Sequence, residues 1–157
     1  GTYGTAILSR YPLENTRSVF TFSDQDEIGT AEAEIQVGDR RIAIFNVHPD
    51  GSEEAMLAFA STLVARAGGY EHVIALGDYN LRGDDEGYLI VDAVYVNAWM
   101  STYPTGVSPD GTDMSGRNRI DHIFVSESFS VVNPIYVLPP DSWTDHPVHW
   151  TDLIWED

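Results

Sequence analysis

An amphipathic helix flanked by two apolar strands constrains the fold of this chain most strongly. Ser52 precedes two glutamates, which is typical of a helix N-terminus, and two successive glycines are typical of its end. Between these signals apolar residues recur every three or four positions, so we expect a helix over residues 52–67. Apolar runs predict strands over 40–47 and 72–76. This order of strand, helix and strand indicates a layered α/β domain.

Shorter patterns predict the remaining elements. Alternating or continuous apolar residues indicate six further strands, over residues 3–9, 18–22, 30–37, 119–125, 130–138 and 147–155. Gly38-Asp39 is a signal for a two-residue hairpin turn. Pro134 predicts an edge or a bulge in its strand, because proline cannot donate to a ladder. A short helix is expected over 84–93, and residues 104–118 have the composition of a loop.

The composition limits the kinds of molecule and ion that this chain is expected to bind. The 157 residues correspond to about one domain, without cysteine and without an apolar run of the ~18 residues that cross a bilayer. Twenty-five acidic residues oppose eight arginines and no lysine, which gives a net charge of −17. Such a surface repels polyanions and lacks the basic patch of a nucleic-acid binder. Clustered acids can instead hold divalent cations through oxygen ligands.

Four polar groups occur at the ends of apolar strands. They are His48, then Asp78 with Asn80, then Asp121, and finally Asp145 with His146. Burying carboxylates and imidazoles is costly unless they pair with each other or with a metal. Carboxylates that bind a cation and align water, with imidazoles that stabilise developing charge, are the groups that metal-assisted phosphoester hydrolysis requires.

Each group also has a purely structural interpretation. Asp78 and Asn80 follow Gly77 and could form an Asx turn at the end of the strand. His48 could be a turn residue before a proline. Asp121 could form a structural salt bridge with Arg119 or Arg117. The residues alone leave these alternatives open.

Five segments carry a resemblance to a known family. GTAILSRYPL, NVHPD, ALGDYN, RIDHIFVS and TDHPVHW, in this order and spacing, resemble the endonuclease/exonuclease/phosphatase superfamily. The resemblance implies a four-layer αββα sandwich of two mainly antiparallel sheets. Family members begin with a strand ending in Asn and a later strand with a metal-binding Glu, and neither precedes Gly1. We therefore expect residues 1–157 to be a single domain, the C-terminal part of the family domain, with its N-terminal strands missing.

The resemblance also implies roles for individual residues. Asp78 aligns or deprotonates the attacking water and contributes to the metal site, and Asn80 holds a phosphate oxygen. His48 donates to the phosphate. His146 stabilises the pentacovalent transition state, and Asp121 orients His146.

The remaining implied contacts concern metal and substrate. Asp145 is expected to ligate Mg²⁺ or Mn²⁺. Tyr3 lies near the position of a phosphate-contacting tyrosine in many family members, and Arg10 is a further candidate for the substrate's phosphate.

Three functional hypotheses follow. The first is a metal-dependent phosphodiesterase or phosphatase acting on a small-molecule or lipid phosphoester. The second is a DNA nuclease, which the charge disfavours because nucleases contact backbone phosphates through Lys and Arg. The third is a catalytically silent fragment or binding module. The TDHPVHW segment also resembles family domains appended to bacterial membrane proteins, which predicts membrane association through segments outside this chain.

Overall fold

The computed structural model describes residues 4–22, 27–115, 119–137, 140 and 144–155. The strands in these ranges are β1 (Glu14–Phe22), β2 (Glu27–Val37), β3 (Arg40–Asp50), β4 (His72–Asp78), β5 (Val96–Asn97), β6 (Asp121–Val125), β7 (Phe129–Val137) and β8 (Val148–Trp155). The helices are α1 (Glu53–Ala67), α2 (Glu86–Asp92) and α3 (Ala98–Thr102). None of these helices is long and apolar enough to cross a membrane.

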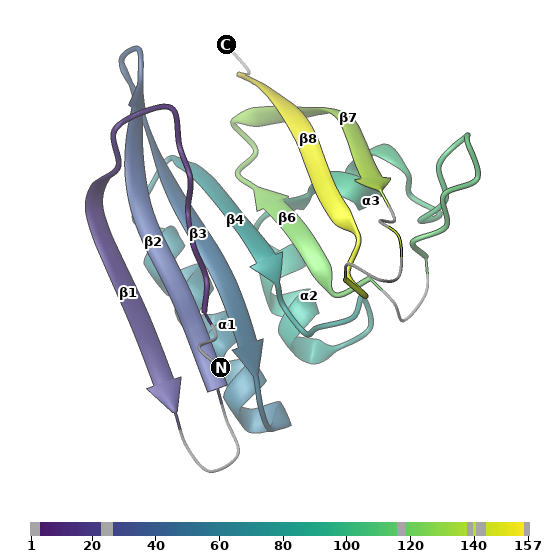
Figure 1. Cartoon of the computed structure of the whole chain (residues 1–157), viewed down its shortest axis with the longest axis horizontal. Helices are drawn as coiled ribbons and strands as arrows, with labels where there is room; N and C mark the ends of the chain where they lie inside the picture. The colour runs from purple at the N-terminus through teal and green to yellow at the C-terminus, as the bar shows by residue number, and fades with distance from the viewer. Residues whose placement is uncertain (1–3, 23–26, 116–118, 138–139, 141–143, 156–157) are drawn as a thin grey trace.

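A six-stranded mixed sheet forms the centre of the molecule (Figure 1), with the strand order β1-β2-β3-β4-β6-β5. Only β3 and β4 run parallel, and α1 makes the crossover between them. Parallel neighbours need such a crossover, which is why the strand–helix–strand pattern constrained the fold. All other neighbours in this sheet are antiparallel.

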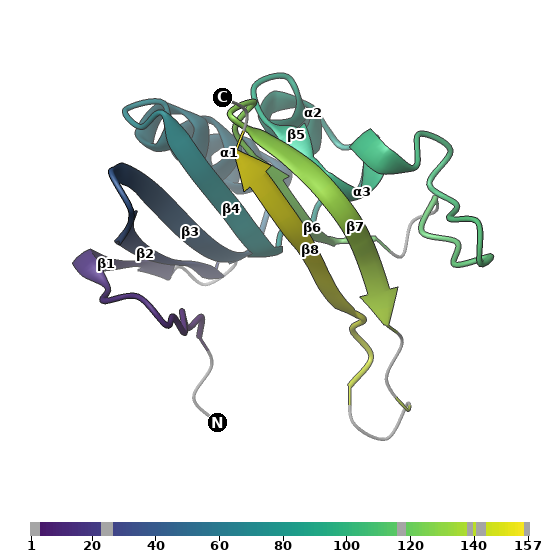
Figure 2. The same cartoon turned by 90° about the horizontal axis from the view of Figure 1, so that it is seen from above.

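A second sheet of β7 and β8 packs against one face of the first, while α1 and α2 cover the other face (Figure 2). Phe45 and Val47 of β3 point to the helices and pack with Phe59. Ile42, on the opposite face of β3, packs with Phe129 between the two sheets. This alternation along one strand produces two cores, and it confirms the expected mixed α/β sandwich of two sheets.

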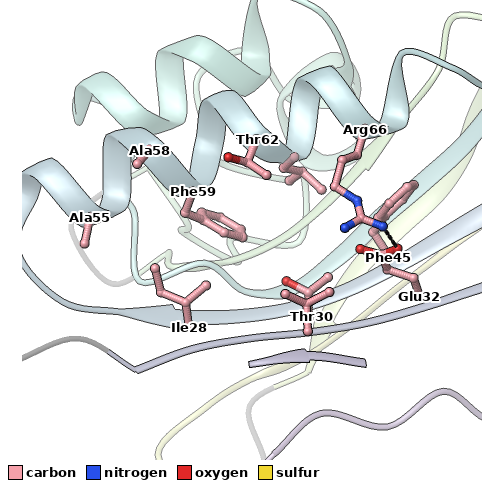
Figure 3. Close-up of a pocket in the computed structure, with 11 residues that line it drawn as sticks. Ile28, Thr30, Glu32, Phe45, Ala55, Ala58, Phe59, Thr62 and Arg66 are labelled. Atoms are coloured by element: carbon pink, nitrogen blue, oxygen red, sulfur yellow. Dashed lines mark hydrogen bonds and ion pairs between the residues drawn. The ribbon is translucent and has the colours of Figure 1, made fainter. Parts of the chain in front are cut away.

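The helix α1 begins and ends as its sequence predicts. The side chain of Ser52 accepts a hydrogen bond from the backbone N–H of Ala55, and Gly68 is the C-cap residue. A cavity of about 320 Å³ lies between α1 and strands β1 to β3, lined mostly by apolar side chains (Figure 3). Arg66 reaches from α1 to Glu32 of β2 at one end of this cavity.

Two segments differ from the sequence-based expectation. The strand predicted over residues 3–9 is wrong for the described part, since residues 4–9 form no ladder and Leu8 is 97% exposed. The backbone carbonyl of Ala6 accepts instead from the side chain of Asn46 (2.7 Å), and β1 occupies the edge of β2. The stretch around Trp99, for which no helix or strand was predicted, forms β5 and α3, and Asn97 caps the helix through the N–H of Met100.

Candidate active site

The topology of the central sheet brings three of the polar groups together. Because β3 and β4 are parallel, their C-terminal ends meet at one edge, where His48 and Asp78 lie. The strand β6 runs antiparallel to β4 and begins at this edge, so Asp121 is the register partner of Asp78. His146 arrives from the second sheet, two residues before β8. The site is therefore assembled from both sheets.

Asp78 lies at the centre of this cluster and also forms the turn after β4. Its Oδ1 accepts a hydrogen bond from the backbone N–H of Asn80 (2.9 Å), which is the predicted Asx turn. Its Oδ2 lies 3.3 Å from Nε2 of His48 and 3.9 Å from Nε2 of His146. The turn uses one oxygen and leaves the other directed at two imidazoles.

Asp121 and His146 form a second pair in the cluster. Nδ1 of His146 lies 2.9 Å from Oδ2 of Asp121, and this hydrogen bond raises the pKa of His146 above its usual range. Burial raises the pKa of Asp121, an effect that the hydrogen bond to His146 opposes. The alternative ion pair between Asp121 and Arg119 is not formed, and Arg117 lies outside the described residues.

Asn80 adopts a left-handed backbone conformation, with φ of 48°. Its Nδ2 donates to the backbone carbonyl of Pro49 (3.0 Å), which ties the loop after β4 to the end of β3. A primary amide carries two N–H donors, so one remains for a ligand.

Gly77 permits the close approach of β3 and β4 beside the site. A Cβ at this position would lie 2.2 Å from the backbone oxygen of Val47, and φ is +134°. Only glycine fits these two conditions together. The sequence signal for Gly77 was strand termination, whereas its structural role is to place Asp78 next to His48.

Two supporting residues carried no clear sequence signal. The hydroxyl of Tyr136 on β7 donates to the backbone carbonyl of Asp121 (2.6 Å), and a contact between two sheets leaves no trace in local sequence pattern. Nε2 of His122 donates to the backbone carbonyl of Leu81 (2.8 Å), and burial lowers the pKa of His122 to about 3. His122 is thus a neutral histidine inside the fold.

Asp78, Asp121 and His146 could together hold a metal ion, because one ligand atom from each lies within 4.8 Å of the others. Two carboxylates on adjacent strands repel each other, and the charge of Asp78 contributes to the raised pKa of Asp121. A divalent cation would relieve this repulsion, and oxygen ligands suit Mg²⁺ or Mn²⁺. The two carboxylates of this set therefore fit such an ion.

Three predicted residues lie outside this group. Asp145 is exposed and reaches His146 only through its charge. Arg10 is exposed and forms no hydrogen bond or ion pair with the described residues of the cluster. Tyr3 lies outside the described residues. Their roles stay predictions.

The sequence model of the Endonuclease/Exonuclease/phosphatase family matches residues 1–146. This chain therefore belongs to that family, as the five ordered segments indicated. No curated protein sequence matches the chain.

Solved structures of this family share the fold. An endonuclease/exonuclease/phosphatase from Bacteroides vulgatus superposes with a TM-score of 0.69 at 18% identity, over 93% of this chain and 67% of its own. The human Nocturnin catalytic domain, solved with a bound sulfate anion, superposes with a TM-score of 0.65 at 19% identity, over 94% of this chain and 61% of its own. TDP2 from D. rerio, complexed with a single-strand DNA product, superposes with a TM-score of 0.60 at 15% identity, over 82% of this chain and 60% of its own. The chain thus spans about two thirds of these proteins or less.

Proposed function

We propose that this chain carries the catalytic centre of a divalent-metal-dependent phosphoester hydrolase acting on a small-molecule or lipid phosphoester. The observation that supports this most is the position of Asp78 Oδ2, which faces both His48 and His146. One carboxylate oxygen between two imidazoles can orient a water molecule while the imidazoles donate to a phosphate.

In the proposed mechanism the side chains have separate tasks. Asp78 aligns the attacking water and accepts its proton. The free amide N–H of Asn80 and Nε2 of His48 hold the phosphate oxygens. His146 donates from Nε2 to the charge that develops in the transition state, and Asp121 fixes its ring through Nδ1. A raised pKa suits His146 to this task, because it favours the protonated form of the imidazole.

The proposed metal ligands are the carboxylates of Asp78 and Asp145. A protonated imidazole cannot ligate a cation, so His146 is better suited to donate than to coordinate. When bound, Mg²⁺ or Mn²⁺ supplies neutralisation of phosphate charge and lowers the pKa of its water.

Hydrolysis of bis-p-nitrophenyl phosphate tests this proposal. We expect turnover with Mg²⁺ or Mn²⁺, loss of turnover on treatment with EDTA, and recovery when the metal is restored. A matched control is Arg17→Gln, which changes an exposed charge on β1 and should leave turnover unchanged. Turnover that persists fully in EDTA would contradict the metal dependence.

A nuclease of the same family is the second candidate. The similarity in fold to TDP2, solved with a DNA product, favours it. The net charge of −17 opposes it, because accumulating phosphates on this surface is unfavourable.

A catalytically silent binding module is the third candidate, since the chain covers at most about two thirds of its solved relatives shown above. It predicts that metal binds and no phosphoester is hydrolysed. Calorimetric titration with Mn²⁺ beside the turnover assay separates this case from the enzyme.

A further inference from the structure

Arg119 is a buried cation that forms no salt bridge in the part of the chain that the structure describes. Its side chain belongs to a residue that is only 5% exposed, and it forms no ion pair with a carboxylate of the described residues. Arg41 and Arg66, by contrast, pair with Glu34 and Glu32. In a chain with 25 acidic residues, the lack of a carboxylate partner for Arg119 among the described residues is unusual, since buried charges are normally paired.

The neighbours of Arg119 provide acceptors for only some of the hydrogen-bond donors of its guanidinium group. One nitrogen, Nη1, donates over a long 3.4 Å to Oδ1 of Asn97. The guanidinium carbon lies 5.8 Å from the ring centroid of Tyr88. Nε is buried and has no hydrogen-bond partner. These contacts are with neutral groups, so they orient the side chain and form no salt bridge with it.

Arg119 lines a pocket of about 460 Å³ together with Arg82, Gly83 and Ser115. Two of the eight arginines of the chain therefore border one cavity. Gly83 keeps the guanidinium accessible, because even a Cβ there would lie 3.3 Å from Nη2. The volume falls in the range of roughly 300–1,000 Å³ typical of ligand pockets, so there is room beyond a single ion.

The pocket adjoins the loops of the catalytic cluster without including any of its side chains. Arg82 comes two residues after Asn80, and Arg119 comes two residues before Asp121. His122 joins these two segments through its hydrogen bond to the carbonyl of Leu81.

We propose that this cavity, the Arg119 pocket, binds a phosphate group of a ligand at a site separate from the catalytic cluster. A tetrahedral oxyanion matches the planar fork of the guanidinium and supplies the salt-bridge partner that Arg119 lacks among the described residues. The proposal does not require the chain to be a hydrolase. The phosphate could be free inorganic phosphate or a second phosphate of a larger substrate.

Two acidic residues also border the pocket and set its selectivity. Asp84 and Asp92 line its wall, and Asp92 accepts a hydrogen bond from the hydroxyl of Tyr88. Their charges oppose an anion, so phosphate binding should be moderate in strength. Removing one of them, in Asp92→Asn, should strengthen it.

Calorimetric titration of the chain with inorganic phosphate in EDTA tests the proposal without catalysis or metal. We expect saturable binding that weakens about tenfold or more in Arg119→Gln, the loss typical of a hydrogen bond to a charged group. Arg119→Lys should retain part of the affinity, and the exposed control Arg17→Gln should retain all of it. If Arg119→Gln does not fold, the exposed Arg82→Gln provides the same comparison.

Two further titrations identify where the phosphate binds and whether it is free phosphate or part of a larger substrate. Binding that survives in His146→Ala places the phosphate outside the catalytic cluster, whereas loss there would overturn the proposal. Tighter binding of phenyl phosphate than of inorganic phosphate indicates a substrate-borne group, and equal binding indicates free phosphate. Absence of saturable binding, or equal affinity in Arg119→Gln and wild type, would also overturn it.

Discussion

In the proposed mechanism Asp78 combines a structural and a chemical role in one carboxylate, and mutation can separate the two roles. In Asp78→Asn the side-chain oxygen can still accept from the N–H of Asn80, so the turn is kept. The negative charge facing His48 and His146 is lost. We expect thermal stability within about 1 kcal/mol of wild type and turnover lower by about 10²–10⁴-fold. Circular dichroism and the bis-p-nitrophenyl phosphate assay measure the two effects, and unchanged turnover would remove Asp78 from the mechanism.

The pKa of His146 reports its pairing with Asp121. The hydrogen bond to Asp121 is the main cause of the raised pKa, so Asp121→Asn should lower it towards the ordinary 6.5. An NMR titration of the histidine ring measures this directly. Asp145→Asn is the matched control and should have a smaller effect, because Asp145 acts on His146 only through its charge and contributes least among the causes.

The hydrogen bond between Asp121 and His146 also predicts how the stability of the fold changes with pH. A raised pKa in the folded state means that the folded chain holds the proton more tightly than the unfolded chain. The contribution of His146 to the free energy of unfolding is therefore complete below about pH 6.5, and it is lost as pH rises through the raised pKa of the folded state. Asp121→Asn should flatten this part of the stability profile.

At the scale of elements, the contact between β3 and β4 depends on Gly77. In Gly77→Ala the new methyl group would collide with the backbone of Val47, and the φ of +134° would be strained. We expect a loss of at least about 2 kcal/mol in the free energy of unfolding, measured with urea. Gly69→Ala is the control, since its nearest neighbour lies at an ordinary 3.6 Å. Equal stability of the two variants would show that the strands can separate without cost.

The elements with local signals were predictable and those that depend on distant partners were not. The helix α1 has an N-cap, an apolar face and a glycine stop, and it starts within one residue of the prediction. The hairpin at Gly38-Asp39 and the irregularity near Pro134 also follow from local chemistry. Residues 4–9 have a strand-like sequence and form no strand, because a strand also requires a neighbouring edge.

The candidate site was predictable as a set of residues and not as a geometry. Strand ends and family resemblance indicated the candidate side chains, and His48, Asp78, Asp121 and His146 among them lie together in the structure. The sequence could not indicate that Asp78 divides its two oxygens between a turn and two imidazoles. Nor could it indicate the contact of Tyr136 with Asp121, which joins different sheets.

At the scale of the whole molecule, net charge predicts which phosphoesters the proposed enzyme would hydrolyse. A net charge of −17 repels a polyanion, and salt screens this repulsion. We expect hydrolysis of sphingomyelin or inositol phosphates to exceed nicking of plasmid DNA at low salt, and the difference to narrow as salt rises. Efficient nicking at physiological salt would favour the nuclease instead.

We propose above all that two pairs of side chains, His48 with Asp78 and Asp121 with His146, act as one catalytic site. A double-mutant cycle on kcat/KM with bis-p-nitrophenyl phosphate and Mg²⁺ tests it most directly, using Asp78→Asn, His146→Ala and the double variant. Side chains that work as a unit are non-additive, so the double variant should lose about as much as the worse single variant. Losses that multiply, or single variants that keep wild-type turnover, would contradict the claim.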